Sequence, residues 1–302
     1  MELDRANVSI CGGLIAPRLA LAVSTARRGR VDTPVIDRHQ INKGHVVRAS
    51  IRRLAAASTA ALVTASLLLG PAAIEASVIY HHPRTSAGAT SNAGWASSNW
   101  SGYAKTGAYT AVTAAWVVPS VASSRKPTYS SQWVGIDGFN NSSLIQTGTE
   151  ADFYNGSAHY AAWWEILPAA ETVIPSITVH PGDHMSASIT NVSGTNWTIT
   201  ITDTTTGASS TTAHTYSGPG TSAEWIEEAP SVGGRIATLA KYSSPDTFDP
   251  GTANGSSPGL TAADGGVMIQ RNAQVSTPSA PDSDTDGFNM AYGRTAPAPP
   301  GS

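Results

Sequence analysis

The sequence contains a single cysteine, Cys11, and only 13% of its 302 residues are charged. The 226 residues after Ala76 have no cysteine. Because no disulfide can stabilise this part of the chain, it must depend on a hydrophobic core, and it is long enough to bury one as a single domain.

Basic residues are also scarce after Ala76. Five of the 21 acidic and ten of the 18 basic residues precede Ser77, so the rest of the chain carries 16 acidic against eight basic side chains, a formal charge of about −8. No basic stripe remains, which argues against a nucleic-acid partner. Few cations limit charge repulsion in acid, and few carboxylates limit the ion pairs that acid can break, so the composition suits an acidic environment.

The apolar run from Leu54 to Leu69 is too short for a comfortable membrane span. It follows Arg48, Arg52 and Arg53 and leads into small residues that end at Ala76. This pattern predicts a secretory signal peptide at residues 46–76 and a secreted, extracellular protein without membrane contact after its removal. A buried or membrane-anchoring helix is the alternative.

The segments around this signal are assigned by composition. Residues 1–45 are Arg-rich and show no periodicity. They are interpreted as an over-extended start, with translation really beginning near Val46, or as a leader segment; a long twin-arginine-like leader is the alternative. Residues 77–97 contain His81-His82-Pro83 and a Ser/Ala/Gly run, as in a flexible leader or a short propeptide. Residues 98–294 are predicted to form one domain, and the Pro/Ala/Gly-rich residues 295–302 a flexible tail.

Long amphipathic helices and internal repeats are missing from Ser98 onward. Short alternating segments such as Trp197–Thr202 are instead separated by Gly, Asn, Asp and Pro at roughly 8–12 residues, which predicts an all-β antiparallel sandwich or barrel. Asn155-Gly156 is typical of a hairpin turn.

The segment from Ser130 to Gly148 predicts a hairpin that carries an unusual polar residue. Strands at Gln132–Ile136 and Ser143–Thr147 flank a turn that begins at Asp137-Gly138. Gln146 lies at the apolar end of the second strand, so its amide needs partners or a cleft. A core amide bonded to backbone is the alternative.

Four segments add to the Gln146 strand, one of them within the same hairpin. They are Ser98-Asn-Trp-Ser-Gly102, Trp133-Val-Gly-Ile-Asp-Gly138, Tyr160-Ala-Ala-Trp-Trp-Glu-Ile-Leu-Pro168 and Ser222-Ala-Glu-Trp-Ile-Glu-Glu-Ala-Pro230. Together with Ile145-Gln-Thr-Gly148, they resemble the glutamic peptidase (eqolisin) family, as a bacterial-type member, in order and rough spacing. The likeness runs from about Ser98 to Asp249, with a weaker continuation to Tyr292.

This resemblance implies a β-sandwich of two large, curved antiparallel sheets (a concanavalin-like architecture) with the active site on the concave face. It also implies a monomeric acid endopeptidase that cleaves polypeptides without a metal or cofactor. The catalytic pair of the family corresponds to Gln146 and Glu228. Glu228 would act as base and then acid, and the Gln146 amide would donate to the oxyanion.

Strand alternation suggests supporting residues. Glu224 and Glu228 share one face of a strand, while Glu227 points to the other face and should be solvated or paired. Trp163 and Glu165 also share a face, and the matching residues of the family lie beside the catalytic pair. Asp137 and Trp100 are weaker candidates. Asp137 could instead only stabilise its own hairpin turn by hydrogen bonds to the backbone. Trp100 could instead be an ordinary core residue.

Two rival functions remain. A glycoside hydrolase could use Glu165 and Glu228 as paired carboxylates, which would leave Gln146 without a role. The second rival is a non-catalytic carbohydrate-binding sandwich, whose binding function would survive replacement of Glu228.

Other motifs lack their required context. Gly255-Ser-Ser-Pro-Gly259 matches a nucleophile elbow, but Pro258 has no N–H for an oxyanion hole. Residues 282–287 resemble the start of a calcium loop, but Gly293 stands at the twelfth position, so a solvated acidic turn is favoured. His180 and His184, like His159 and His214, lie outside any zinc motif.

Overall fold

A computed structural model describes residues 78–88 and 94–302, which belong to one compact unit, Leu69–Ser302. The predicted leader at 1–45 and signal peptide at 46–76 lie outside the described residues. Within the described part, no helix is long and apolar enough to cross a membrane.

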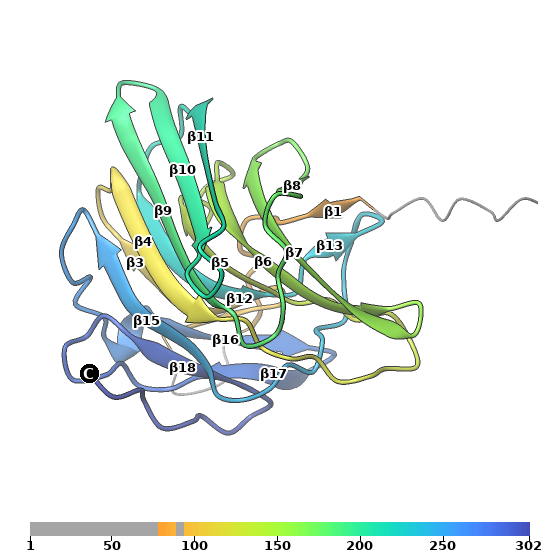
Figure 1. The fold of residues 1–302 in the computed structure, drawn as a ribbon. Coiled ribbons are helices and arrows are strands. Elements are labelled where there is room, and N and C mark those ends of the chain that lie inside the picture. Colours follow the sequence, from red (N-terminus) through yellow and green to blue (C-terminus); the bar gives the residue numbers. More distant parts are fainter. Residues whose placement is uncertain (1–77, 89–93) are drawn as a thin grey trace, which may run out of the picture. The chain divides into compact units, whose positions relative to one another are not determined.

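Strands account for nearly all of the regular structure (Figure 1). Apart from a 3-10 helix at Ala262–Asp264, the elements are β1 Ile79–Tyr80, β2 Trp95–Ser97, β3 Trp100–Thr106, β4 Ala111–Val117, β5 Ser131–Ile136, β6 Ile145–Tyr154, β7 Ser157–Ile166, β8 Thr172–Val173, β9 His184–Ser193, β10 Asn196–Asp203, β11 Ser209–Thr215, β12 Ser222–Glu228, β13 Ser231–Val232, β14 Arg235–Ile236, β15 Asp246–Ala253, β16 Gly265–Gln270, β17 Ala273–Pro278 and β18 Phe288–Tyr292. The predicted hairpins around Asp137-Gly138 and Asn155-Gly156 are confirmed as β5–β6 and β6–β7.

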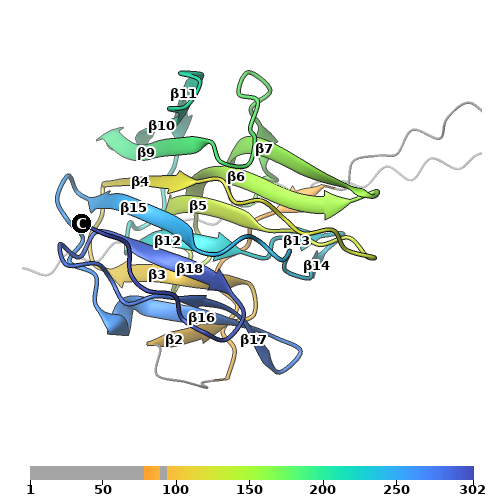
Figure 2. The same ribbon diagram turned by 60° about the horizontal axis from the view of Figure 1, so that its bottom comes forward.

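Hydrogen bonds connect most strands into one bent network in the order β11-β10-β9-β4-β15-β18-β17-β16-β3-β12-β5-β6-β7-β8. Its neighbouring strands are antiparallel, while β2 joins β16 in parallel. The network folds back on itself, so that β4, β9 and β10 pack against β5, β6 and β12 (Figure 2). The predicted all-β class and its antiparallel layering are confirmed.

The main core lies between these layers. Alternate residues of β4 and β10 are buried, as expected for strands with one face toward a core. Two tryptophans of this core also bond across the layers. Trp225 of β12 donates to the Thr113 carbonyl at 2.8 Å, and Trp116 of β4 donates to Thr149 Oγ1 at 2.9 Å. Buried indole N–H groups thereby find partners, which fixes one layer on the other.

A second, smaller cluster covers the opposite face of β5 and β12. It consists of the fully buried Trp100, Trp133, Leu144, Trp163 and Ile226. Every residue of β5 and β12 is therefore buried, although neighbouring side chains point to opposite faces. Polar residues on these strands are consequently forced into contact with one another or with this cluster.

The segments flanking the predicted domain are attached to it. Strand β1 pairs with β13 through Ile79 with Val232 and Tyr80 with Ser231, so a flexible leader does not describe residues 79–87. A short propeptide stays a prediction for this segment. In the expected tail, the Ala298 carbonyl accepts a hydrogen bond from Asn289 Nδ2 at 2.8 Å, which anchors it at that point.

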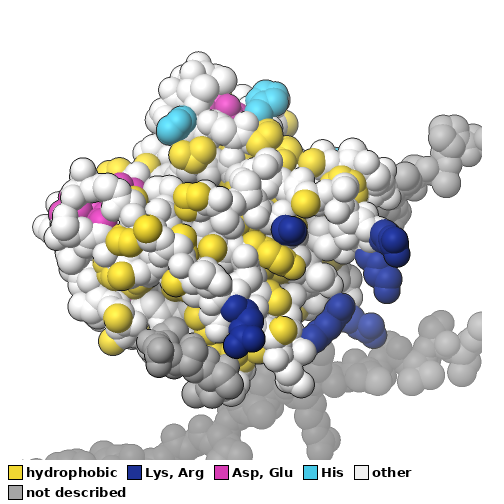
Figure 3. All heavy atoms as spheres, turned by 90° about the horizontal axis from the view of Figure 1, so that it is seen from below, with side chains coloured by type: hydrophobic (Ala, Val, Ile, Leu, Met, Phe, Trp, Pro, Cys, Tyr) yellow, Lys and Arg dark blue, Asp and Glu magenta, His cyan; other side chains and the backbone are white. Residues whose placement is uncertain are grey.

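Charged groups are sparse on the face shown in Figure 3, where Lys and Arg side chains lie toward one side of the molecule and a few acidic groups toward the other. The interior, in contrast, contains carboxyl groups. Glu227 of β12 and Asp246 of β15 are 0% and 1% exposed and lie together between the layers, where Gln132 Nε2 donates to Glu227. The expectation that Glu227 is paired is confirmed.

This pair should make the fold more stable in acid. Burial raises the pKa of Asp246 to about 8, and burial together with Asp246 raises the pKa of Glu227 well above its usual value. Because the unfolded chain titrates near about pH 4, their stabilisation is complete below that pH and is lost between about pH 4 and 8. We expect the midpoint of thermal unfolding to be at least about 5 °C lower at pH 8 than at pH 4.

Circular dichroism melts across this range measure the effect. The variant Asp246→Asn, which removes one titrating group, should show a smaller difference between the two pH values. A midpoint that stays constant or rises from pH 4 to pH 8 would contradict the prediction.

Candidate active site

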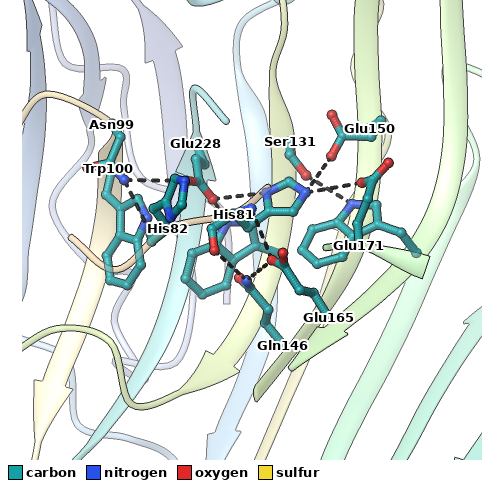
Figure 4. Close-up of polar contacts among 12 residues, drawn as sticks. His81, His82, Asn99, Trp100, Ser131, Gln146, Glu150, Glu165, Glu171 and Glu228 are labelled. Atoms are coloured by element: carbon teal, nitrogen blue, oxygen red, sulfur yellow. Dashed lines mark hydrogen bonds and ion pairs between the residues drawn. The ribbon is translucent and has the colours of Figure 1, made fainter. Parts of the chain in front are cut away.

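The register of five strands brings the predicted catalytic side chains to one face. Glu228 of β12 lies opposite Trp100 of β3 and Ser131 of β5, while Gln146 of β6 lies opposite Glu165 of β7. Paired positions on neighbouring strands point to the same side of a sheet. Figure 4 accordingly shows Gln146, Glu165, Glu228 and Trp100 around one site.

Tryptophans form the walls of this site. Trp100 and Trp133 meet edge to face, with ring centres 4.8 Å apart, and Trp163 Nε1 donates to Ser131 Oγ at 3.1 Å. Gly148 lies opposite both Trp133 and Trp163 on the neighbouring strands. A Cβ atom at Gly148 would lie 2.5 Å from the Trp133 Cβ and 2.2 Å from the Gln132 carbonyl oxygen, so only glycine fits there.

Gln146 is fully buried, and its amide nitrogen has two acceptors. Nε2 donates to Glu165 Oε2 at 2.7 Å and to the His81 carbonyl at 3.3 Å. Its Oε1 has no hydrogen-bond partner among the described residues. Gln146 is therefore oriented by a carboxyl group rather than serving as a core amide bonded only to backbone.

Glu165 is buried beside this amide. Burial raises the pKa of Glu165 to about 8, with His81 opposing the shift and Glu228 adding to it. A carboxyl group with this pKa is protonated and uncharged in acid.

Both carboxylate oxygens of Glu228 are held. Trp133 Nε1 donates to Oε2 at 2.8 Å, and Asn99 Nδ2 donates to Oε1 at 3.4 Å. The His81 Nδ1 atom lies 3.0 Å from the same Oε2. This surrounding set of donors suits a carboxylate that accepts a proton.

His81 was not predicted as a site residue, yet it occupies the centre of the site. Its side chain is fully buried, and its ring is stacked on Trp163 with ring centres 3.7 Å apart and planes 4° from parallel. Its backbone N–H donates to Glu165 Oε2 at 3.0 Å. No pattern in the sequence around His81 indicates this position, since the segment has no strand-like alternation.

Two further carboxyl groups surround the His81 ring. Nε2 lies 3.0 Å from Glu150 and 3.3 Å from Glu171. Burial by itself would lower the pKa of His81, but the carboxyl groups of Glu150, Glu171 and Glu228 outweigh it and raise this pKa well above its usual value. Burial raises the pKa of Glu150 to about 7, although His81 opposes this shift. Alternation from Gln146 through Gly148 would have identified Glu150 as a residue of the same face.

The remaining two candidates lie outside this group. Asp137 accepts hydrogen bonds from Tyr216 Oη at 2.6 Å and from the backbone N–H groups of Gly220 and Thr221 at 2.8 Å, so it fastens the β5–β6 turn to the segment before β12. Glu224 is buried on the same face of β12 as Glu228, and burial raises its pKa well above the usual value. No hydrogen bond between the described residues links either side chain to Gln146 or Glu228.

The other motifs do not form a second catalytic centre. Ser257 lies in a loop and donates to the Asp284 carbonyl at 3.0 Å. The acidic turn is less solvated than expected, since Asp282 is 6% exposed and offers oxygens within 4.8 Å of those of Asp249 and Asp286. The twelfth-position carboxylate of a calcium loop is missing there.

Residues 98–292 match the Peptidase A4 family. The chain belongs to this family. Aspergillopepsin-2 of Aspergillus niger is 31% identical to this peptidase over an alignment of 217 residues, gaps included, which covers 63% of this chain and 76% of that protein.

Solved structures of similar proteins agree with this assignment. Scytalido-glutamic peptidase in complex with a transition state analog inhibitor has 28% identity and a TM-score of 0.56, covering 65% of this chain and 98% of its own. SCP-B, a member of the Eqolisin family, has 26% identity and a TM-score of 0.53 with the same coverage. The resemblance to glutamic peptidases, the β-sandwich fold and the activity as a glutamic-type endopeptidase are confirmed.

The hydrogen bond from Trp133 to Glu228 gives a testable consequence for this peptidase. A hydrogen bond to a charged group contributes about 1.5–3 kcal/mol, and about 1.4 kcal/mol corresponds to a factor of ten in rate. Because Trp133→Phe removes a donor that holds Glu228 Oε2, kcat/KM of this variant at about pH 3.5 should fall by about 10-fold.

Trp100→Phe is the matched control. Trp100 Nε1 has no partner among the described residues, so this variant should keep kcat/KM within about threefold of wild type. Equal losses in both variants would show that aromatic packing, and not the hydrogen bond, accounts for the effect.

Proposed function

We propose that this peptidase is a secreted acid endopeptidase in which Gln146 and Glu228 form the catalytic pair. The observation that carries the proposal is that both side chains reach the same residue in the site. Gln146 Nε2 lies 3.3 Å from the carbonyl oxygen of His81, and Glu228 Oε2 lies 3.0 Å from its ring. A peptide carbonyl can therefore meet an amide donor while a carboxylate lies beside it.

The proposed reaction follows from these positions. Glu228 takes a proton from water, and the water oxygen bonds to the peptide carbon. Gln146 Nε2 donates to the oxygen that becomes negative. As the C–N bond breaks, Glu228 returns the proton to the leaving nitrogen, which leaves a new carboxyl group and a new amine.

Glu165 is a positioning residue in this scheme. Its Oε2 accepts the Gln146 amide N–H at 2.7 Å, which fixes how the amide is turned. With its pKa raised to about 8, Glu165 stays neutral in acid and does not compete with Glu228 as a base.

Polypeptides are the substrate class that fits this reaction. Scytalido-glutamic peptidase was solved with a peptide-based transition state analog, and SCP-B with the tripeptide Ala-Ile-His. A glycoside hydrolase that uses Glu165 and Glu228 would leave the buried Gln146 without a catalytic role. Secretion is supported by the signal-like residues 46–76, and work in acid by the scarcity of charges.

Replacement of either catalytic residue should abolish peptide cleavage. At about pH 3.5, Glu228→Gln and Gln146→Ala should each lower kcat/KM by about 100-fold or more, because they remove the base and an oxyanion donor respectively. Cleavage of a quenched fluorescent peptide measures this, with circular dichroism as the test of folding.

Glu224→Gln is the matched control, since it changes a buried glutamate on the same face of β12 that has no bond to the pair. It should cleave at close to the wild-type rate. Full activity in a folded Glu228→Gln protein would overturn the assignment, and cleavage of glycans but not peptides would favour the glycoside hydrolase.

A further inference from the structure

The acidic turn before β18 and the end of β15 bring three carboxyl groups together. Asp282 and Asp286 lie in the turn and Asp249 lies on β15, and one oxygen of each is within 4.8 Å of the others. Strands β15 and β18 run side by side, which keeps the two segments next to each other (Figure 2). Burial and the neighbouring carboxylates raise the pKa of Asp249 and of Asp286, so like charges are crowded at this place.

One oxygen of this group is buried without a partner. Asp282 is only 6% exposed, and its Oδ2 atom has no hydrogen-bond partner among the described residues. The other oxygen, Oδ1, accepts the backbone N–H of Asp286 at 3.1 Å, which fixes how the carboxyl group is turned. A buried carboxylate oxygen without a donor is costly, so Oδ2 needs a positively charged partner.

This oxygen points toward Asp249 beside a glycine. A Cβ atom at Gly287 would lie 2.4 Å from Asp282 Oδ2 and 2.8 Å from Asp249 Oδ1. The two oxygens therefore converge next to a residue without a side chain, and any side chain there would collide with both. Within residues 78–88 and 94–302, the ion pairs include none of the three aspartates, so no Lys or Arg supplies the positive charge.

Backbone hydrogen bonds fix the turn to the rest of the domain. The Asp286 carbonyl accepts from the Gly251 N–H at 2.9 Å, and the Thr285 carbonyl accepts from the Leu260 N–H, also at 2.9 Å. The carboxyl groups are thus held in position before a ligand binds, which lowers the cost of binding.

The spacing of the oxygens favours calcium over magnesium. Calcium binds oxygens at about 2.4 Å, so it can bridge two that lie up to about 4.8 Å apart, whereas magnesium at about 2.1 Å bridges about 4.2 Å. Magnesium also demands near-octahedral geometry, while calcium accepts irregular sets of carboxylates completed by water. Asp249, from a different strand, offers a carboxylate in place of the one that a calcium loop would have at Gly293.

We propose that Asp249, Asp282 and Asp286 form a calcium site that joins β15 to the turn before β18. The pairing of β15 with β4 shifts its register between Phe248 and Gly251, so the ladder is interrupted next to Asp249. The ion holds the chain at this interruption and stabilises the folded domain. This structural role is independent of the proposed catalytic pair.

Direct binding tests the site. Equilibrium dialysis of the full chain at about pH 6.5, after removal of metals with EDTA, should show one Ca²⁺ per chain with a Kd of about 0.1–1 mM. Asp282→Asn removes the charge but keeps an oxygen for the Asp286 N–H, and it should weaken binding at least about 10-fold. Absence of binding at up to about 10 mM Ca²⁺, or equal binding by Asp282→Asn, would overturn the site.

Asp284→Asn is the matched control. Asp284 lies in the same turn and is exposed, but it is outside the group of three. This variant should bind Ca²⁺ with a Kd within about threefold of wild type. A loss as large as that of Asp282→Asn would mean that the turn attracts cations only by its overall charge, and would overturn the assigned ligands.

Thermal stability provides a second measurement, which on the wild-type protein needs no variant. A ligand that binds only the folded chain raises Tm. About 10 mM CaCl₂ at about pH 6.5 should raise Tm by at least about 3 °C, and MgCl₂ at the same ionic strength by less than about 1 °C. Asp249→Asn should lose the calcium shift. Equal shifts with the two salts would overturn the choice of calcium, and no shift with either would overturn the stabilising role.

Discussion

The shared register of β3, β12, β5, β6 and β7 determines what the site contains. Each strand presents alternate residues to the cluster of tryptophans and the others to the core between the layers. A slip of one residue in β12 would bury Glu228 between the layers and turn Glu227 to the site. The pairing of β12 with β3 and β5 has no bulge, so its parity is uninterrupted from Ala223 to Glu228.

Alternation explains why part of the site could be predicted from the sequence. Gln146, Glu228, Trp163 and Glu165 lie on strands, and their facing follows from the period of two. The rest of the site depends on contacts between distant segments. His81 is 147 residues from Glu228 and lies in a segment without periodicity. Asp137 was recognised by its turn, but its main partners are about 80 residues away, which local turn chemistry cannot show.

The low charge of the sequence and the buried acids belong together. Few Lys and Arg are present to pair with carboxylates. Several buried acidic side chains have no basic partner within residues 78–88 and 94–302, among them Asp246, Glu224 and Glu227. Such groups are tolerated in a low-dielectric interior when they carry a proton. Under acidic conditions these buried side chains are therefore uncharged, and the interior resembles that of a protein without buried charges.

The attachment of residues 79–85 on both sides of the site has a kinetic consequence. A segment joined covalently to the domain it contacts experiences an effective concentration that is typically of the order of millimolar. Contacts too weak to hold a free peptide are then sufficient to keep the site filled. A cut in the chain would let the segment diffuse away. The same few contacts can thus hold His81 beside Gln146 and Glu228 in the intact chain but not after a cut.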